Sequence, residues 1–311
     1  MNPVSDKRGA GEALTRHTLK GFVPAIVTPF APDGAIVEDA FGALVEWLIG
    51  LGAEAICVAG DNGESWNLDL DERKHLTRLA VDRAAGRIPI VTGVSAPSAA
   101  QTIRYAQAVV EAGASGLLVL PQPYVLKASR DELTRRFAAL AHAVDIPIIA
   151  YNSPRRSGID LSLDDLDAIM NVAPIVGIKE ASRDFFHHTH LIERFRERLA
   201  IMVGPCHFMI PALALGAHGY IASGPELLGP MASKIIPLAR AAPSPELARV
   251  HYQLTAVYEM MMGTGTWPAA LKAALNLLGQ PAGVPREPVM PLAGADLEKV
   301  RKTLTTRGLL R

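Results

Sequence analysis

Eight short runs of apolar residues recur along the 311-residue chain, with amphipathic stretches between them. Each run is apolar throughout and does not alternate with polar residues, which is typical of a parallel strand buried on both faces. The repeated order of run and amphipathic stretch therefore predicts parallel strand–helix units. The runs span residues 22–28, 55–60, 88–94, 115–120, 146–151, 174–180, 199–204 and 218–223.

The stretches between the runs have helical spacing. Phe41, Leu44 and Leu48 fall on one helical face, as expected for a helix that packs on a sheet. Acidic or hydroxyl residues such as Asp71 and Ser129 stand where helices should begin, because their side chains cap free backbone N–H groups. Eight such units predict an α/β fold of the (β/α)8 TIM-barrel type in preference to an open parallel sheet.

The chain continues past the eighth run for longer than one closing helix requires. Helical patterns cover residues 231–241, 245–263, 267–279 and 294–307. We therefore expect three parts, namely a flexible N-terminal tail (1–18), the barrel (19–230) and a small C-terminal helical domain (231–311).

The composition argues against several classes of function. Lys plus Arg and Asp plus Glu each number 31, so the formal net charge is zero, without the basic excess that favours nucleic acid or a membrane surface. We expect no targeting peptide, membrane span or nucleotide-binding glycine loop, since the sequence has none of these patterns. Two cysteines without a CxxC spacing indicate a reducing compartment, and we expect a cytoplasmic protein.

Two residues stand out at the carboxyl ends of the predicted strands, where barrels place their chemistry. Lys179 follows an apolar run, and burial there would lower its pKa from ~10.4 and leave a neutral amine that attacks carbonyl carbon. The alternative is a structural ion pair with Glu180, which alternation along a strand disfavours. Tyr151 ends the preceding run, where its phenol either transfers protons beside Lys179 or merely completes the strand.

Five motifs follow one another along the chain: Thr28-Pro29-Phe30, Gly60-x-x-Gly63-Glu64, Tyr151 to Gly158, Gly177 to Ser182, and Pro268 to Gly279. Together they resemble the dihydrodipicolinate synthase / N-acetylneuraminate lyase family over roughly residues 19 to 308. The resemblance implies a barrel with a C-terminal helical domain, usually in a homotetramer. It also implies Schiff-base chemistry on pyruvate or another 2-oxo acid, with no metal or organic cofactor.

The resemblance assigns roles to individual residues. Lys179 matches the imine-forming lysine and Tyr151 the proton-transfer tyrosine. A turn of glycines brings backbone N–H groups close to an anion, so the loop that contains Asp61 is expected to hold the carboxylate of the 2-oxo acid. Arg156 matches an arginine that binds the carboxylate of a second substrate. The substrate-binding residues implied in this way are Gly60, Asn62, Gly63, Glu64, Arg156 and Ile221.

The sequence departs from the family pattern at three places. Asp61 stands where the family usually has a proton-relaying threonine. It either stabilises the iminium or acts as a base, or it simply caps the following turn. Tyr124 is shifted by one position from a tyrosine of the synthase branch, and Pro123 has no phenol. His207 belongs to a third altered loop, where it faces either the pocket mouth or solvent.

These departures leave several functions open. We favour a Schiff-base aldolase or dehydratase that acts on pyruvate or a sugar-acid-like 2-oxo acid, with Lys179, Tyr151 and Asp61 as catalytic residues. The alternatives are 4-hydroxy-tetrahydrodipicolinate synthase, which Arg156 supports, and a paralogue that binds a 2-oxo acid without turning it over. A metal-dependent aldolase lacks a visible ligand set, because two histidines on one helical face, His187 and His190, are weak evidence without a third ligand.

Overall fold

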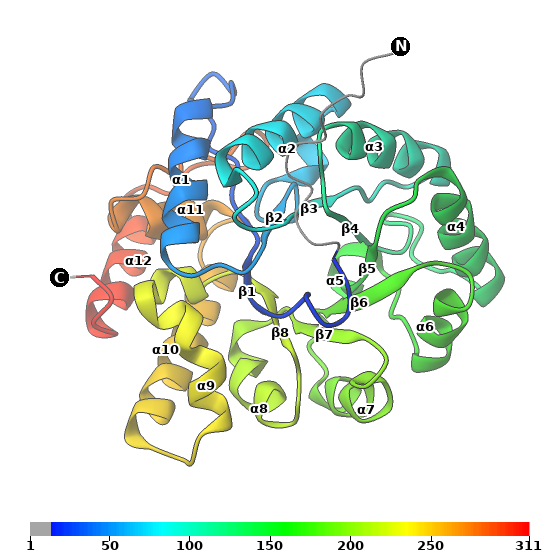
Figure 1. Ribbon diagram of the computed structural model, residues 1–311. Helices are drawn as coiled ribbons and strands as arrows, with labels where there is room; N and C mark the ends of the chain where they lie inside the picture. Colours follow the sequence, from blue (N-terminus) through cyan, green and yellow to red (C-terminus); the bar gives the residue numbers. More distant parts are fainter. Residues whose placement is uncertain (1–13, 311) are drawn as a thin grey trace, which may run out of the picture.

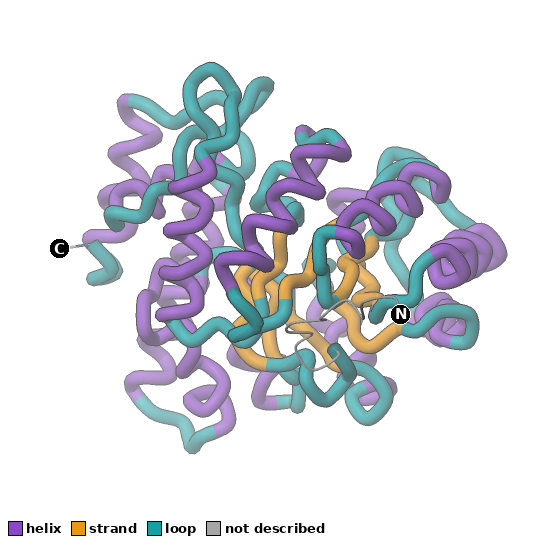
Figure 2. Tube along the Cα trace, turned by 45° about the horizontal axis from the view of Figure 1, so that its top comes forward, coloured by secondary structure: helices purple, strands orange, loops and turns teal. Residues whose placement is uncertain are grey.

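A closed ring of strands surrounded by helices forms the centre of the molecule (Figures 1 and 2). The computed structural model describes residues 14–310. Within these residues eight parallel strands lie in the order β1-β8-β7-β6-β5-β4-β3-β2, and a bridge between Ala25 and Cys57 connects the two ends of this order. The strands are β1 (Gly21–Pro24), β2 (Ile56–Val58), β3 (Ile90–Gly93), β4 (Gly116–Val119), β5 (Ile148–Asn152), β6 (Ile175–Glu180), β7 (Ala200–Val203) and β8 (Gly219–Ala222).

Each observed strand overlaps one of the eight apolar runs, so the predicted TIM barrel is confirmed. The helices that follow the strands form the outer layer (Figure 1). The α-helices of the described residues, including the C-terminal ones, are in chain order α1 (Glu38–Gly50), α2 (Leu70–Ala84), α3 (Ala99–Glu111), α4 (Arg130–Ala143), α5 (Pro154–Ser157), α6 (Leu163–Met170), α7 (Phe185–Phe195), α8 (Met209–Ala214), α9 (Ile235–Arg240), α10 (Pro245–Met262), α11 (Ala269–Leu277) and α12 (Gly294–Thr306).

The expected capping residues are partly correct. Ser129 caps α4 in a capping box with Glu132. Asp71 does not cap α2 but lies in its first turn, and the cap is Asp69, whose side chain accepts the N–H of Glu72. Both positions suit a carboxylate near a helix N-terminus, which is why the sequence pattern alone does not separate them.

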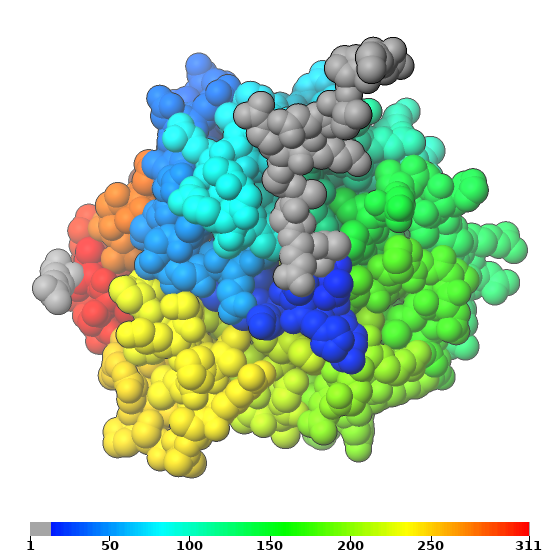
Figure 3. Space-filling view, in the orientation of Figure 1, coloured from blue at the N-terminus to red at the C-terminus, as the bar shows by residue number. Residues whose placement is uncertain are grey.

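The C-terminal helices pack along one flank of the barrel. Figure 3 shows them in yellow to red beside the blue N-terminal segments. The expected helix at 231–241 is only partly α-helical, because its first turn is 3-10; the chain is interrupted just before it, at Gly229, which has a left-handed backbone (φ 60°) and is followed by Pro230. A 3-10 segment (Pro225–Lys234) and the short α9 take its place.

The N-terminal boundary also differs from the expectation. Residues 1–13 of the expected tail lie outside the described part of the chain. Leu14 is only 2% exposed and packs with Leu19 in the barrel core, so the ordered chain includes the end of the stretch expected to be loose. Among residues 14–310, no helix is both long and apolar enough to cross a membrane.

Candidate active site

Lys179 and Tyr151 lie side by side at the carboxyl end of the barrel. The register of β5 and β6 pairs them directly, and the Lys179 Nζ lies 4.3 Å from the centroid of the Tyr151 ring. Both side chains are almost fully buried. The predicted proximity of the lysine and the tyrosine is therefore confirmed, and its cause is the parallel pairing of consecutive strands.

Burial controls the charge of Lys179. Desolvation lowers the pKa of its amine, and the neighbouring Cys57 and Asp61 offset part of this effect. Among the described residues Lys179 forms no ion pair. Glu180 points away from it, accepting hydrogen bonds from Asn152 Nδ2 (2.9 Å) and Ser182 N (2.6 Å). The alternative of a structural Lys179–Glu180 pair is therefore wrong, as strand alternation predicted.

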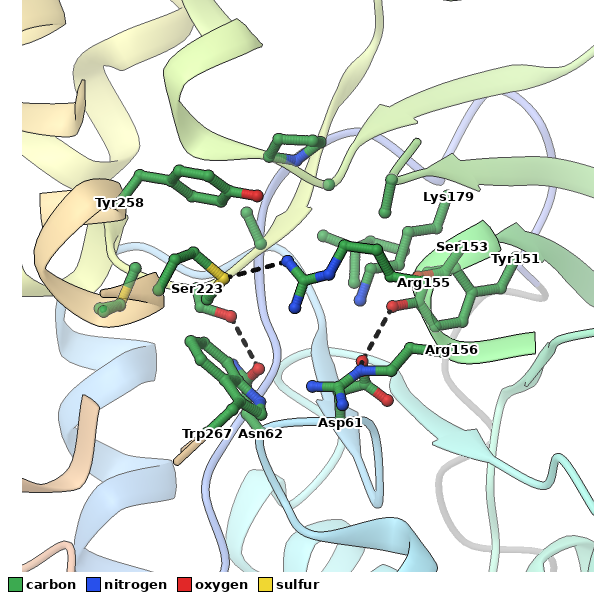
Figure 4. Close-up of a pocket in the computed structure, with 17 residues that line it drawn as sticks. Asp61, Asn62, Tyr151, Ser153, Arg155, Arg156, Lys179, Ser223, Tyr258 and Trp267 are labelled. Atoms are coloured by element: carbon green, nitrogen blue, oxygen red, sulfur yellow. Dashed lines mark hydrogen bonds and ion pairs between the residues drawn. The ribbon is translucent and has the colours of Figure 1, made fainter. Parts of the chain in front are cut away.

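Asp61 connects the tyrosine to an arginine. Its Oδ2 accepts a hydrogen bond from Arg156 Nε at 2.6 Å and a longer one from the Tyr151 hydroxyl at 3.3 Å (Figure 4). Burial, and next the charge of Asp61, raise the pKa of Tyr151 well above its ordinary value, which keeps the phenol protonated. Among the described residues the Asp61 side chain forms these two hydrogen bonds and none to the turn that follows it. Asp61 therefore does not cap that turn.

Two buried cationic side chains, Lys272 and Arg73, contact the end of the loop after β2. Lys272 of α11 lies 2.5 Å from Glu64 Oε1 and also donates to the carbonyl oxygens of Thr28 and Val284. Arg73 of α2 donates to the Ser65 carbonyl oxygen on the other side. These bonds fix the loop although Glu64 itself has a left-handed backbone (φ 55°), which is uncommon for a residue other than glycine.

The predicted loop residues divide into two groups. Asp61 and Asn62 line the pocket, whereas Gly60, Gly63 and Glu64 do not. The Asn62 side chain donates to the Ala25 carbonyl oxygen (2.6 Å) and accepts from Ser223 Oγ (2.7 Å), so it is held by the protein where we expected it to bind a carboxylate. Within the described residues, the backbone N–H groups of Asp61, Asn62 and Gly63 make no hydrogen bond.

The pocket is small and opens to solvent. Arg156 and Ile221 line it as expected. The sequence analysis missed the residues that form the rest of the wall. These are Ser153, Arg155, Ala181, Gly204, Pro205, Ala222, Ser223, Tyr258, Met261, Met262 and Trp267.

Four of the missed residues come from the C-terminal region, and the other seven lie at the ends of the barrel strands or just after them. Tyr258 of α10 and Trp267 lie at the pocket (Figure 4), and Met262 at the end of α10 also lines it. In the methionine run of residues 260–262, Met260 and Met261 are buried, and Met261 and Met262 line the pocket. For the pocket wall formed by the chain after β5, the sequence signal was the adjacent pair of arginines at 155–156.

The histidines that attracted attention in the sequence have other partners. His207 is half-buried against the rings of Phe208 and Tyr258, and burial lowers its pKa to about 4, so it neither lines the pocket nor faces open solvent. The Nε2 of His187 lies 3.2 Å from Glu180 Oε2, and the Nδ1 of His190 lies 3.6 Å from Glu193 Oε2. Within residues 14–310, no three His, Cys, Asp or Glu side chains gather as a metal-binding group.

Comparison with known proteins gives a consistent result. Residues 18–307 match the Dihydrodipicolinate synthetase family. The 4-hydroxy-tetrahydrodipicolinate synthases of Sorangium cellulosum and Alkalilimnicola ehrlichii are each 34% identical, covering 94% and 93% of this chain and 97% and 99% of theirs. A crystal structure of the chloride-inhibited dihydrodipicolinate synthase of Acinetobacter baumannii complexed with pyruvate superposes with a TM-score of 0.87 at 28% identity, covering 94% of this chain and 100% of that chain. The chain therefore belongs to the dihydrodipicolinate synthetase family and is a lyase of that family.

Proposed function

We propose that the enzyme forms a Schiff base between Lys179 and pyruvate or a related 2-oxo acid. The observation that carries this proposal is a buried, unpaired amine of lowered pKa in a pocket beside a tyrosine. The neutral amine attacks the C2 carbonyl, and loss of water gives an iminium. The iminium withdraws electrons from C3, so a C3 proton can leave to give an enamine. A bond at C3 or C4 can then form or break.

Tyr151 and Asp61 are suited to move the protons. The raised pKa keeps the phenol of Tyr151 protonated, and this phenol gives its proton to the hydroxyl formed at C2 before water leaves. Asp61 accepts the hydrogen bond of that phenol, and its charge favours the positive iminium. Because Arg156 is bound to the same carboxylate, Asp61 is held toward Tyr151.

The free backbone N–H groups of residues 61–63 support a carboxylate-binding role for the loop of Gly60 to Glu64. In this proposal Glu64 contributes through its backbone, because its side chain is bound to Lys272. Gly63 allows the turn to pack closely, since a Cβ there would lie 3.2 Å from the Ile26 carbonyl oxygen. Ile221 faces the substrate from β8.

For the second half of the reaction we favour an aldolase or a dehydratase on a sugar-acid-like 2-oxo acid. Asp61 supplies a carboxylate in place of a relaying hydroxyl, and Pro123 has no phenol at the position where the synthase branch has a tyrosine. Condensation of pyruvate with aspartate semialdehyde is the second candidate, supported by the names of the two bacterial relatives. Measuring pyruvate consumption with and without aspartate semialdehyde separates the two.

We also propose a cytoplasmic homotetramer. The zero net charge does little to oppose association. The exposed apolar side chains of Tyr124, Val125 and Leu126 support an interface with a second copy. Light scattering should give about four times the chain mass of 33.2 kDa. A monomer at micromolar concentration would rule the tetramer out.

Borohydride reduction tests the Schiff base. Wild-type protein mixed with pyruvate and borohydride should gain the mass of one reduced adduct, and peptide mapping should place it on Lys179. The Lys179→Arg variant keeps the charge but never presents a neutral amine, so it should gain no adduct, whereas Lys127→Arg should behave like wild type. Modification of Lys127 or Lys272, or no adduct with any 2-oxo acid, would overturn the mechanism. Retention of activity with a chelator would separate it from a metal-dependent aldolase.

A further inference from the structure

A buried polar pair lies directly behind Lys179 and Tyr151. Asn152 follows Tyr151 on β5. Glu180 follows Lys179 on β6, and the register of the two strands pairs it with Asn152. Because successive side chains of a strand point to opposite faces, Asn152 and Glu180 point away from the pocket. Both residues are fully buried, and neither lines the pocket.

The Glu180 carboxylate connects three segments of the chain. Its Oε2 accepts a hydrogen bond from Asn152 Nδ2 of β5 (2.9 Å) and lies 3.2 Å from His187 Nε2 of α7, and its Oε1 accepts the backbone N–H of Ser182 (2.6 Å). Asn152 also donates to Asp160 Oδ1 at 2.8 Å. These contacts join the ends of β5 and β6 to α7 on the outer side of the barrel.

Glu180 carries a negative charge in this environment, and His187 is its cationic partner. Desolvation alone would raise the pKa of Glu180, but its hydrogen bonds, first among them the one from His187, and the nearby His188 outweigh this effect, so the pKa lies below its ordinary value. In return, the hydrogen bond to Glu180 raises the pKa of His187, although burial opposes it. The exposed carboxylates of Asp160 and Asp184 also favour the protonated form of His187.

Given the Schiff-base function proposed above, we infer that Glu180 is a positioning residue, whose carboxylate holds Lys179 beside its tyrosine while a protonated His187 compensates the charge. Glu180 touches no substrate and acts through the end of β6. Attack on a carbonyl requires a correctly placed amine and proton donor, and a misplacement of about 1 Å can slow such a step roughly 10²-fold. Loss of the His187 proton leaves a buried carboxylate without its cation, which is strongly unfavourable. The strand end that carries Lys179 then relaxes.

The test follows the exchange of the pyruvate methyl protons for deuterium in D2O, which gives a kcat and a KM for enamine formation. NMR titration gives the pKa of His187 directly. His187→Gln keeps a hydrogen-bond donor without the charge, and His187→Lys keeps a cation throughout the pH range. His190→Gln is the matched control, since His190 lies on the same helix with a side chain that is 63% exposed.

The pKa of His187 should lie above the ordinary histidine value of ~6.5. At a pH below this pKa, His187→Gln should lower kcat roughly three- to tenfold, as expected when a charge-assisted hydrogen bond becomes a neutral one, and His187→Lys should restore most of the loss. KM should change little, because the loop of residues 60–64 is untouched. As the pH rises through the pKa of His187, wild type loses the same charge, so the ratio of wild-type to His187→Gln rates should fall toward one.

Glu180→Gln removes the carboxylate itself and should lower kcat roughly tenfold or more at every pH. His190→Gln should exchange protons at the wild-type rate. Four outcomes would overturn the inference. They are a His187 pKa at or below ~6.5, a ratio of wild-type to His187→Gln rates that stays constant with pH, an equal loss of kcat in His190→Gln, and a folded Glu180→Gln variant with the wild-type kcat.

The failure of this inference is distinguishable from the failure of the proposed function. A wild type that forms no adduct with pyruvate and borohydride refutes the Schiff base, and the positioning role falls with it. A wild type that is trapped on Lys179 but shows a constant rate ratio refutes only the role of Glu180 and His187.

Discussion

Replacing Asp61 should slow proton transfer without preventing imine formation. The Asp61 carboxylate forms a hydrogen bond to Arg156 at 2.6 Å and one to Tyr151 at 3.3 Å, with side chains of Asp61 and Arg156 that are 16% and 29% exposed. A charge-assisted hydrogen bond contributes about 1.5–3 kcal/mol. If Asp61 stabilises the transition state of C3 deprotonation by this amount, its loss slows that step roughly 10- to 150-fold.

The assay follows exchange of the pyruvate methyl protons in D2O by NMR, because this exchange needs the enamine but no second substrate. Asp61→Asn and Asp61→Thr should both reduce its kcat by about tenfold or more, although threonine is the commoner residue of the family. Borohydride trapping with pyruvate should persist in both variants. The negative charge of Asp61 raises the pKa of Lys179, so Asp61→Asn should lower that pKa and move the pH dependence of trapping to lower pH.

Asp33→Asn is the matched control, since Asp33 is exposed in a turn and accepts the N–H of Ala35. It should exchange pyruvate protons at the wild-type rate. Nearly full exchange in Asp61→Asn, with an unchanged pH profile, would refute the catalytic role of Asp61. The synthase would then become the better assignment.

Three further predictions concern neighbouring groups. Tyr151→Phe should lower proton exchange by roughly 10²- to 10⁴-fold while pyruvate is still trapped, and exchange at the wild-type rate would exclude the phenol as the proton donor. Glu64→Gln should reduce the free energy of unfolding, measured by urea denaturation, by about 3–5 kcal/mol, because it leaves the buried Lys272 without its counter-ion. A loss of only a few tenths of a kcal/mol would show that the ion pair does not hold the loop. Because burial lowers the pKa of Lys179, trapping should increase with pH and reach its half-maximum below the ordinary lysine value of ~10.4, and a half-maximum at that value would contradict a desolvated amine.

The barrel was predictable because its signal is local and repeated. Every strand lies within or across one apolar run, and parallel pairing of consecutive strands then places Tyr151 beside Lys179. Helix ends were less certain, since several residues near each end are able to cap; Asp69 and Asp71 both suit the start of α2. The interruption at Gly229 and Pro230, just before the expected helix at 231–241, was marked by residue type, but the 3-10 conformation on either side of it was not.

The half of the pocket away from Lys179 was not predictable from the sequence alone. Tyr258, Met262 and Trp267 lie far along the chain, and only the packing of the C-terminal helices brings them to the barrel mouth. The pairing of Asp61 with Arg156 depends on two loops whose relative position no periodicity encodes. That pairing changes the interpretation of both residues, since it fixes the carboxylate near Tyr151 and occupies the guanidinium of Arg156.

A crystal structure of the enzyme soaked with pyruvate tests the central claim most directly. We predict continuous electron density from the Lys179 Nζ to C2 of pyruvate, with the pyruvate carboxylate at the backbone N–H groups of residues 61–63 and the Tyr151 hydroxyl within hydrogen-bonding distance of the former carbonyl position. Pyruvate bound elsewhere, or bound in this pocket without a covalent bond to Lys179, would contradict the account.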